Sequence, residues 1–211
     1  MNAPDARRTT RVLPLLIALP TLLLVTACGG ARTHELPRAE PGVRIAFADY
    51  SVLPPEGRNW RVAGRRDDAI VFGWRPSRTH SLVALASEKE ASRPMTGQDD
   101  LVAYVRADWD ASTWKKEARY QNRQTDLEAD SRFGPYCVRY RLQSEDHGAV
   151  NRGEAPFLVQ RSIGLICFHP KQPQRLVHIS YTERSLPDEG DATFAKDADR
   201  YISGLRLADQ P

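Results

Sequence analysis

The 211-residue sequence has no large excess of charge of either sign. It contains 30 Lys and Arg residues against 27 Asp and Glu residues, and removing the first 27 residues leaves 27 against 26. Proteins that bind nucleic acid through its phosphates carry a clear basic surplus, so we expect no nucleic-acid partner. The remaining 184 residues contain no internal repeat, and they suffice for one domain with a substantial core.

Recognisable catalytic motifs are also missing. The sequence has no His-Glu-x-x-His zinc motif, no Gly-x-Ser-x-Gly nucleophile elbow and no glycine-rich phosphate loop. These absences argue against the enzymes that such motifs identify, but they do not cover an active site assembled from distant residues. We expect no cofactor.

The sequence has a single long apolar run, which lies at its start. Val12–Ala27 follows the arginines Arg7, Arg8 and Arg11. The run is shorter than the about 20 apolar residues that a membrane-spanning helix needs. A basic start, a compact apolar middle and small residues at the end are typical of an export signal. We interpret residues 1–27 as a signal peptide, with an uncleaved membrane anchor as the alternative.

The end of this segment, Val25-Thr26-Ala27-Cys28, resembles the lipobox of bacterial lipoproteins. The resemblance implies that Cys28 receives a diacylglycerol group, becomes the first residue of the mature chain and is acylated on its amino group. Two or three acyl chains hold a protein firmly on a membrane. Gly29 stands where an aspartate would retain enterobacterial lipoproteins in the inner membrane. The resemblance therefore implies an outer-membrane lipoprotein that faces the periplasm, and an ordinary signal peptide cut nearby is the alternative.

The segment after the signal is polar and contains Pro37 and Pro41. This composition predicts an acylated N-terminus with a flexible tether over 28–42. We expect one folded domain over 43–207 and a short tail over 208–211.

Two cysteines, Cys137 and Cys167, remain once Cys28 is acylated. In an oxidising compartment such a pair predicts a disulfide, which would stabilise the fold by about 3 to 4 kcal/mol. Two alternatives stay open. The cysteines and the histidines His169 and His178 could form a tetrahedral zinc site, or His169 could activate Cys167 as a nucleophile.

Alternating apolar residues predict an antiparallel sheet of about six or seven strands. Strands are expected at 43–48, 60–62, 70–74, 80–87, 136–142, 158–168 and 177–182. The strand at 80–87 has apolar residues on both faces, which predicts burial of both. The charged stretch 114–130 is predicted as an edge strand or a mobile loop. An antiparallel meander of the last three strands would place Cys137 beside Cys167.

Two helices are predicted to pack on this sheet. Thr96 and Asp99 resemble a capping box in front of a helix over 97–108. Apolar residues between 194 and 205 share one helical face, with Asp191 as the expected cap. The predicted fold class is therefore α+β, an antiparallel sheet with two helices and one disulfide.

The order of these elements resembles the PsbP-like fold of small extracytoplasmic proteins. The resemblance is carried by the proline-rich turn before Trp60 and by Ser203-Gly204-Leu205 at the end of the last helix. It covers Val43–Leu207. It implies an accessory or assembly role without catalysis, and it transfers no site residue.

Some aromatic residues suit a binding surface. Trp60, Trp74 and Trp109 lie at core-facing spacing, which favours burial over a role in a cleft. Trp114, beside two lysines, lacks that spacing. It is predicted as an exposed contact for lipid or a partner, or as a packed loop residue.

A row of arginines is the second candidate surface. Arg139 and Arg141, together with Arg161, could bind anionic groups of peptidoglycan or of lipid. A solvated strand face is the alternative.

These features lead to a main hypothesis and an alternative. The first is a membrane-anchored lipoprotein whose periplasmic domain binds an envelope protein or peptidoglycan as an accessory or assembly factor; a purely structural role differs only in lacking a ligand. The alternative is an envelope enzyme with a thiol or metal site at Cys167 and His169.

Overall fold

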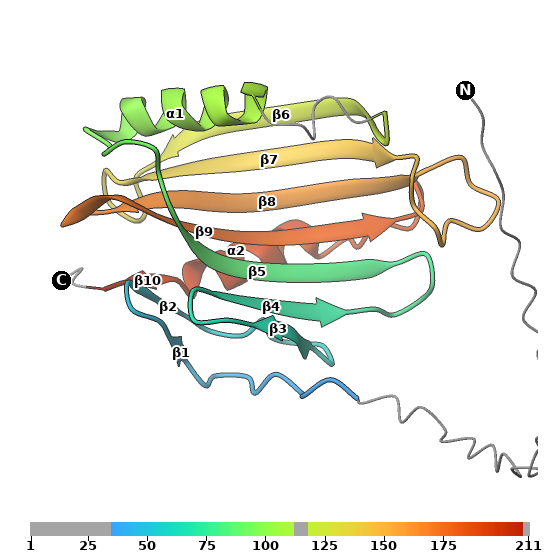
Figure 1. Cartoon of the computed structure of the whole chain (residues 1–211). Coiled ribbons are helices and arrows are strands. Elements are labelled where there is room, and N and C mark those ends of the chain that lie inside the picture. The colour runs from blue at the N-terminus through green and yellow to red at the C-terminus, as the bar shows by residue number, and fades with distance from the viewer. Residues whose placement is uncertain (1–34, 112–117, 209–211) are drawn as a thin grey trace, which may run out of the picture. The chain divides into compact units, whose positions relative to one another are not determined.

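The computed structural model describes residues 35–111 and 118–208, which belong to one compact unit (Figure 1). A seven-stranded sheet forms its centre, with the strand order β3-β4-β5-β9-β8-β7-β6 and antiparallel pairing throughout. Its strands are β3 (Arg61–Arg65), β4 (Ala69–Trp74), β5 (Ser81–Glu90), β6 (Tyr120–Asp130), β7 (Cys137–Asp146), β8 (Leu158–His169) and β9 (Gln172–Ser185). The predicted meander of β7, β8 and β9 is confirmed.

A small second sheet pairs strands from the two ends of the domain. It consists of β1 (Ile45–Ala46), β2 (Tyr50–Val52) and β10 (Arg206–Leu207), with β2 in the middle. The sequence predicted one strand over 43–48. The structure instead has two short strands, because the chain turns back after β1 and pairs β2 with it.

Two helices cover opposite faces of the large sheet (Figure 1). Helix α1 (Gln98–Ala111) buries Leu101 and Val105 against Ile166 and other residues of β7, β8 and β9. Helix α2 (Phe194–Ser203) packs its apolar stripe on the other face, against β4, β5, β8 and β9. The predicted α+β class, with an antiparallel sheet and two helices, is confirmed.

The predicted disulfide is confirmed as well. Cys137 and Cys167 lie directly opposite each other on β7 and β8, and their sulfurs are 2.07 Å apart. Both residues are fully buried on the α2 face of the sheet. The alternation of side chains along a strand places Val138 and Ile166, one position along, on the α1 face.

Burial of β5 on both faces was a wrong prediction. Leu82, Ala84 and Ala86 are fully buried under α2, but Val83 on the other face is 39 % exposed. Helix α1 approaches only the end of β5 at Ser87 and Lys89, so it leaves Val83 uncovered. The capping prediction for α1 also differs in detail, since the Asp100 carboxylate, rather than that of Asp99, accepts from the Thr96 backbone N–H at 2.9 Å.

The ends of the domain and its edge strand complete the fold. The packed chain begins before Val43, because Ala39 is buried and its backbone N–H donates to the Trp60 carbonyl at 2.9 Å. The last part of the segment predicted as tether therefore belongs to the fold.

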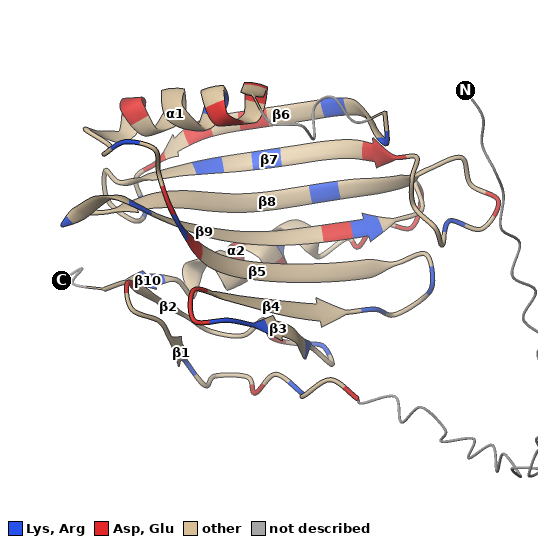
Figure 2. Cartoon of the chain, viewed as in Figure 1, with Lys and Arg blue, Asp and Glu red and all other residues tan. Residues whose placement is uncertain are grey.

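The charged stretch 114–130 was predicted as an edge strand or a mobile loop. From Tyr120 onward it forms the edge strand β6, which carries charges of both signs (Figure 2). In the described ranges, no helix is long and apolar enough to cross a membrane.

Candidate ligand-binding site

Two groups of polar side chains are built into the large sheet, one beside each helix. The group beside α2 centres on Glu183 of β9, whose side chain is fully buried. Its carboxylate pairs with His80 Nε2 at 2.8 Å, with the Arg161 guanidinium, and with the backbone N–H of Asp191 at 2.7 Å. All these partners belong to the protein, so the carboxylate is saturated from within.

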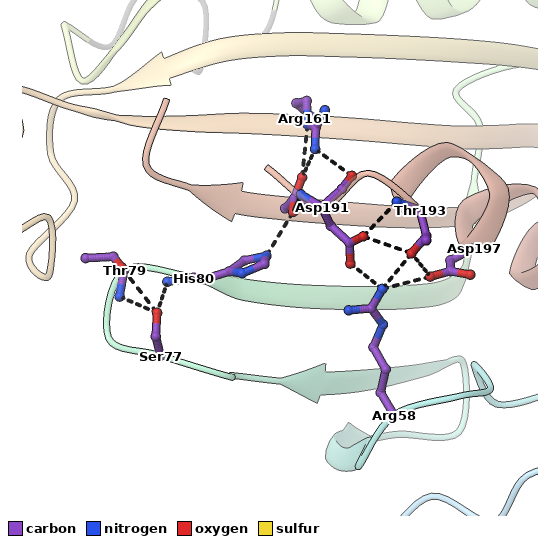
Figure 3. Close-up of polar contacts among 9 residues, drawn as sticks. Arg58, Ser77, Thr79, His80, Arg161, Asp191, Thr193 and Asp197 are labelled. Carbon is purple, nitrogen blue, oxygen red and sulfur yellow. Dashed lines mark hydrogen bonds and ion pairs between the residues drawn. The ribbon is translucent and has the colours of Figure 1, made fainter. Parts of the chain in front are cut away.

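Arg58 extends this network to the start of α2. Its guanidinium donates to the Asp191 carboxylate, to Thr193 Oγ1 at 3.0 Å and to the Asp197 carboxylate at 2.8 Å (Figure 3). It also lies 4.6 Å from the ring centroid of Trp74. Burial acts to raise the pKa of Asp191, but hydrogen bonds from Thr193 and Arg58 outweigh it and hold that pKa below its ordinary value. We call these residues, with Glu183, His80 and Arg161, the α2 network.

The α2 network has a structural explanation that needs no ligand. It joins the segment before β3, the start of β5, strands β8 and β9, and the first turn of α2. Asp191, the predicted cap, lies three residues before α2 and accepts from the Thr193 backbone N–H at 2.7 Å. Its carbonyl also accepts from the Phe194 N–H, so it organises the turn that leads into the helix.

The second polar group lines a cavity of about 220 Å³ between α1 and the sheet. We call this cavity the α1 pocket. Helix α1 supplies one wall, and β5, β7, β8 and β9 supply the floor. The lining residues are Ser87, Lys89, Tyr104, Val105, Asp108, Trp109, Tyr140, Leu142, Gln160, Ser162, Ile166, Leu176 and His178.

Tyr140 and His178 form the polar centre of the α1 pocket. The Tyr140 hydroxyl and His178 Nε2 lie 2.8 Å apart, although β8 separates their strands. The contact is made across Gly164, which is paired with Tyr140 in the sheet register. A Cβ atom at Gly164 would lie 2.4 Å from the Tyr140 ring, so only glycine lets this ring lie across β8.

Both groups of this pair are neutral near pH 7. Burial, aided by the charge of Lys89, lowers the pKa of His178 to about 4. Burial raises the pKa of the Tyr140 hydroxyl above its ordinary value. The pair therefore presents uncharged donor and acceptor groups to the cavity, since neither side chain ionises in the neutral range.

Hydroxyl, amide and aromatic groups surround the pair. Ser162 Oγ lies 2.9 Å from Thr182 Oγ1, and the Gln160 side-chain oxygen accepts from Arg184 at 3.1 Å. The Trp109 ring meets the Tyr140 ring edge-on, with centroids 5.3 Å apart. The charged lining residues, Lys89 and Asp108, pair with each other at 3.3 Å and are about half exposed. The polar groups inside the α1 pocket are therefore uncharged, and apolar side chains supply the rest of its lining.

The alternative metal or thiol site is wrong. The disulfide occupies both Cys137 and Cys167, and His178 lies on the opposite face of the sheet. His169 is buried, and its Nε2 lies 3.1 Å from the Ala208 carbonyl oxygen. These four residues do not converge. Within residues 35–111 and 118–208, no other group of three or more His, Cys, Asp or Glu side chains could hold a metal ion.

The predicted surface contacts have mixed outcomes. Arg139 is buried and pairs with Asp199 of α2, so its predicted role in binding a partner is wrong. Arg141 is exposed and lies 3.5 Å from Glu128, and its role in partner contact stays a prediction. Trp114 lies outside the described residues, as does the lipidation site Cys28.

The tryptophans expected in the core divide into two classes. Trp60 is 1 % exposed, as predicted. Trp74 and Trp109 are only half-buried, because Trp74 stacks under Arg58 and Trp109 lines the α1 pocket.

The α1 pocket itself was not predicted. The alternation along β7 and β9 indicates on which face of each strand Tyr140 and His178 lie. Their contact could be predicted only if the order of β7, β8 and β9 in the sheet were known. The available signal was a small residue, Gly164, in the middle of an apolar strand, which often marks close approach of another group. No protein-family model matches the chain, and no curated protein matches it in sequence.

Proposed function

We propose that this protein is a lipid-anchored lipoprotein of the bacterial outer membrane. In this proposal its periplasmic domain acts as an accessory or assembly factor by binding a ligand in the α1 pocket. The PsbP-like resemblance of the element order is part of the same proposal, since that fold is associated with accessory roles. The observation that carries the binding function is the uncharged polar pair of Tyr140 and His178 inside the α1 pocket.

Two observations support the location in the envelope. The lipobox-like Val25-Thr26-Ala27-Cys28 follows an export-type signal. The disulfide of Cys137 and Cys167 is the kind of bond that forms and persists in an oxidising compartment.

The chemistry of the α1 pocket indicates the ligand class. Neutral Tyr140 and His178 and the hydroxyl of Ser162 can exchange hydrogen bonds with hydroxyl or amide groups of a ligand. Tyr104 and Trp109 supply aromatic surface for its apolar parts. A cavity of about 220 Å³ accommodates a small ring rather than a polymer. These properties favour an uncharged ring that bears hydroxyl groups, such as one sugar of peptidoglycan.

Metabolic labelling tests the anchor. Cells that express the chain are grown with radioactive palmitate, and the protein is isolated and its acylated peptide identified by mass spectrometry. We expect label at Cys28 and none in Cys28→Ser. Label that persists in Cys28→Ser, or no label in either chain, would contradict a lipid anchor at this residue.

Calorimetric titration tests the binding function. The probe is the disaccharide-peptide mixture that a muramidase releases from peptidoglycan. We expect saturable binding that Ser162→Met weakens by about tenfold or more, because the longer side chain fills the α1 pocket. Ser203→Met, at an exposed position of α2, is the matched control and should bind normally. Equal binding by both variants would place the ligand elsewhere, and no binding by the parent chain would exclude this ligand class.

A further inference from the structure

A second cavity, of about 300 Å³, lies at the end of the sheet where β4 leads into β5 and β7 leads into β8. Four arginines from separate parts of the chain contribute to its lining: Arg75 and Arg78 before β5, Arg119 before β6 and Arg184 in β9. Figure 2 shows basic segments on the β4–β5 connection and at the end of β9. We call this region the arginine end of the sheet.

Two arginines of the arginine end share one buried carboxylate. The fully buried Asp146 carboxylate accepts from Arg119 at 2.6 and 2.9 Å, and it lies 3.1 Å from Arg184. One carboxylate thus faces two guanidinium groups. Burial acts to raise the pKa of Asp146, but the two arginines outweigh it and hold that pKa below its ordinary value.

The other two arginines add charge without a carboxylate in the lining. Arg75 donates to the carbonyl oxygens of Ser77 and Arg78, at 3.2 and 3.0 Å, and neutral acceptors leave its charge in place. Arg78 is exposed. The acidic residues of nearby loops, Glu154, Asp188 and Glu189, do not line the cavity. A site of this kind attracts anions with a planar or tetrahedral set of oxygens.

Exposed apolar side chains lie beside these charges. Val150, on the loop between β7 and β8, lines the same cavity and is 93 % exposed. A neighbouring groove shares Arg75 and Ser81 with the cavity and is lined by Leu36, which is 48 % exposed. Basic residues combined with exposed aliphatic side chains are typical of surfaces that rest on anionic lipid headgroups.

The position of Leu36 links this surface to the proposed anchor. Six residues lie between Cys28 and Glu35, so seven residue steps join them and span at most about 25 Å. An acylated Cys28 would therefore keep Glu35 and Leu36, and the arginine end beside them, close to the membrane. The same tether would hold the domain near the surface at high local concentration, where weak headgroup contacts suffice to orient it.

We propose that the domain docks on the membrane through the arginine end, with a lipid phosphate in the cavity of Arg75, Arg78, Arg119 and Arg184 and Val150 in the headgroup layer. The orientation argument rests on the lipid anchor proposed above. In this arrangement the charges of the arginine end face lipid phosphates.

Vesicle sedimentation tests the docking surface without the anchor. The probe is a vesicle of phosphatidylethanolamine and phosphatidylglycerol, and the protein is the unlipidated chain from Gly29 to Pro211, which contains the whole compact unit. We expect binding that weakens with added salt. Arg78→Gln should lower the partition coefficient about fivefold, and Arg75→Gln with Arg78→Gln about 25-fold, at about one such step per arginine. Val150→Ser should lower it less.

Arg206→Gln is the matched control, because it removes the same charge from β10 at the other end of the domain (Figure 1). It should leave binding unchanged. Equal losses in Arg206→Gln and Arg78→Gln, or no binding by the parent chain, would overturn the proposal. Binding to peptidoglycan sacculi that Arg78→Gln weakens, without binding to vesicles, would also overturn it, in favour of peptidoglycan carboxylates at the arginine end. If palmitate labels Cys28 but the unlipidated chain does not bind vesicles, the proposed lipid anchor is retained and only the proposed docking surface is contradicted.

Discussion

The α2 network and the α1 pocket use similar residue types on the two faces of one sheet, but they differ in where their hydrogen bonds go. The Glu183 carboxylate pairs with His80 and Arg161 and accepts a hydrogen bond from a backbone N–H. Protein groups therefore fill its hydrogen-bonding capacity. In the α1 pocket, Tyr140, His178 and Ser162 border a cavity and keep hydrogen-bonding capacity beyond their mutual contacts. A buried polar group is therefore informative about function only after its partners have been counted.

The largest loss of stability is expected when the central carboxylate of the α2 network is removed. Glu183→Ala removes a buried carboxylate and leaves Arg161 and His80 without their main partner. We expect a loss of about 3 to 5 kcal/mol in the free energy of unfolding. Urea denaturation measures it, with Asp188→Ala as a control at an exposed position that should change stability by about 0.5 kcal/mol or less. A loss below about 1 kcal/mol in Glu183→Ala would contradict the structural role of the network.

Removal of the disulfide should act on the same face with a similar or slightly smaller effect. In Cys137→Ala with Cys167→Ala, the unfolded chain gains the entropy of an open loop. The expected cost is about 3 to 4 kcal/mol, measured by urea denaturation without reductant. Because the bond lies on the α2 face, saccharide binding should be retained under conditions where the variant is folded. Loss of binding by the folded variant would show that the two faces are not independent.

The α1 pocket should be the source of a pH dependence. The pKa of His178 is about 4 in the folded protein and about 6.5 in an unfolded chain. Between these values the unfolded chain binds more protons, so the free energy of unfolding should fall as the pH falls from 6.5 to 4, by about 3 kcal/mol in total. His178→Gln should flatten this slope. The partly buried Glu88, whose pKa is raised mainly by desolvation, acts in the opposite direction in both proteins, so the difference between the two curves isolates His178. Parallel curves would contradict a neutral, buried histidine.

A smaller effect is expected from the glycine beneath the pair. Gly164→Ala places a methyl group where the Tyr140 ring now lies, which should cost about 1 to 3 kcal/mol through overpacking. The ring must move, so saccharide binding should weaken as well. Gly153→Ala is a poor comparison because that glycine has a positive φ, whereas Gly97→Ala meets open space and should be nearly neutral. Unchanged saccharide binding in Gly164→Ala would show that Tyr140 does not contribute to the binding site.

Much of the fold could be predicted because local patterns specify it. Alternation in β7 and β9 and the apolar run of β8 located three strands, and their expected antiparallel meander placed Cys137 beside Cys167. Strand β6 was unclear because an edge strand with two largely exposed faces carries few apolar residues, and its order comes from backbone pairing with β7. Burial of β5 was overestimated because sequence cannot tell which strands a helix covers.

The candidate site could not be predicted from the sequence for a related reason. His178 was considered with the cysteines because these residues lie on neighbouring strands, but it occupies the other face. The arginine row was correctly placed on one face, yet Arg139 and Arg161 are used inside the protein, by Asp199 and Glu183. Partners that come from distant elements decide whether a polar residue is structural or available, and no local pattern records them.

The most direct test of the α1 pocket compares the two faces within one sample. Indole N–H signals of Trp109, which lines the α1 pocket, and of Trp60, buried in the core under α2, are followed by NMR during titration with muramidase-released peptidoglycan fragments. The account predicts a saturable shift of the Trp109 signal while the Trp60 signal stays in place. A shift of Trp60 with Trp109 unmoved would contradict it and would place the ligand on the α2 face.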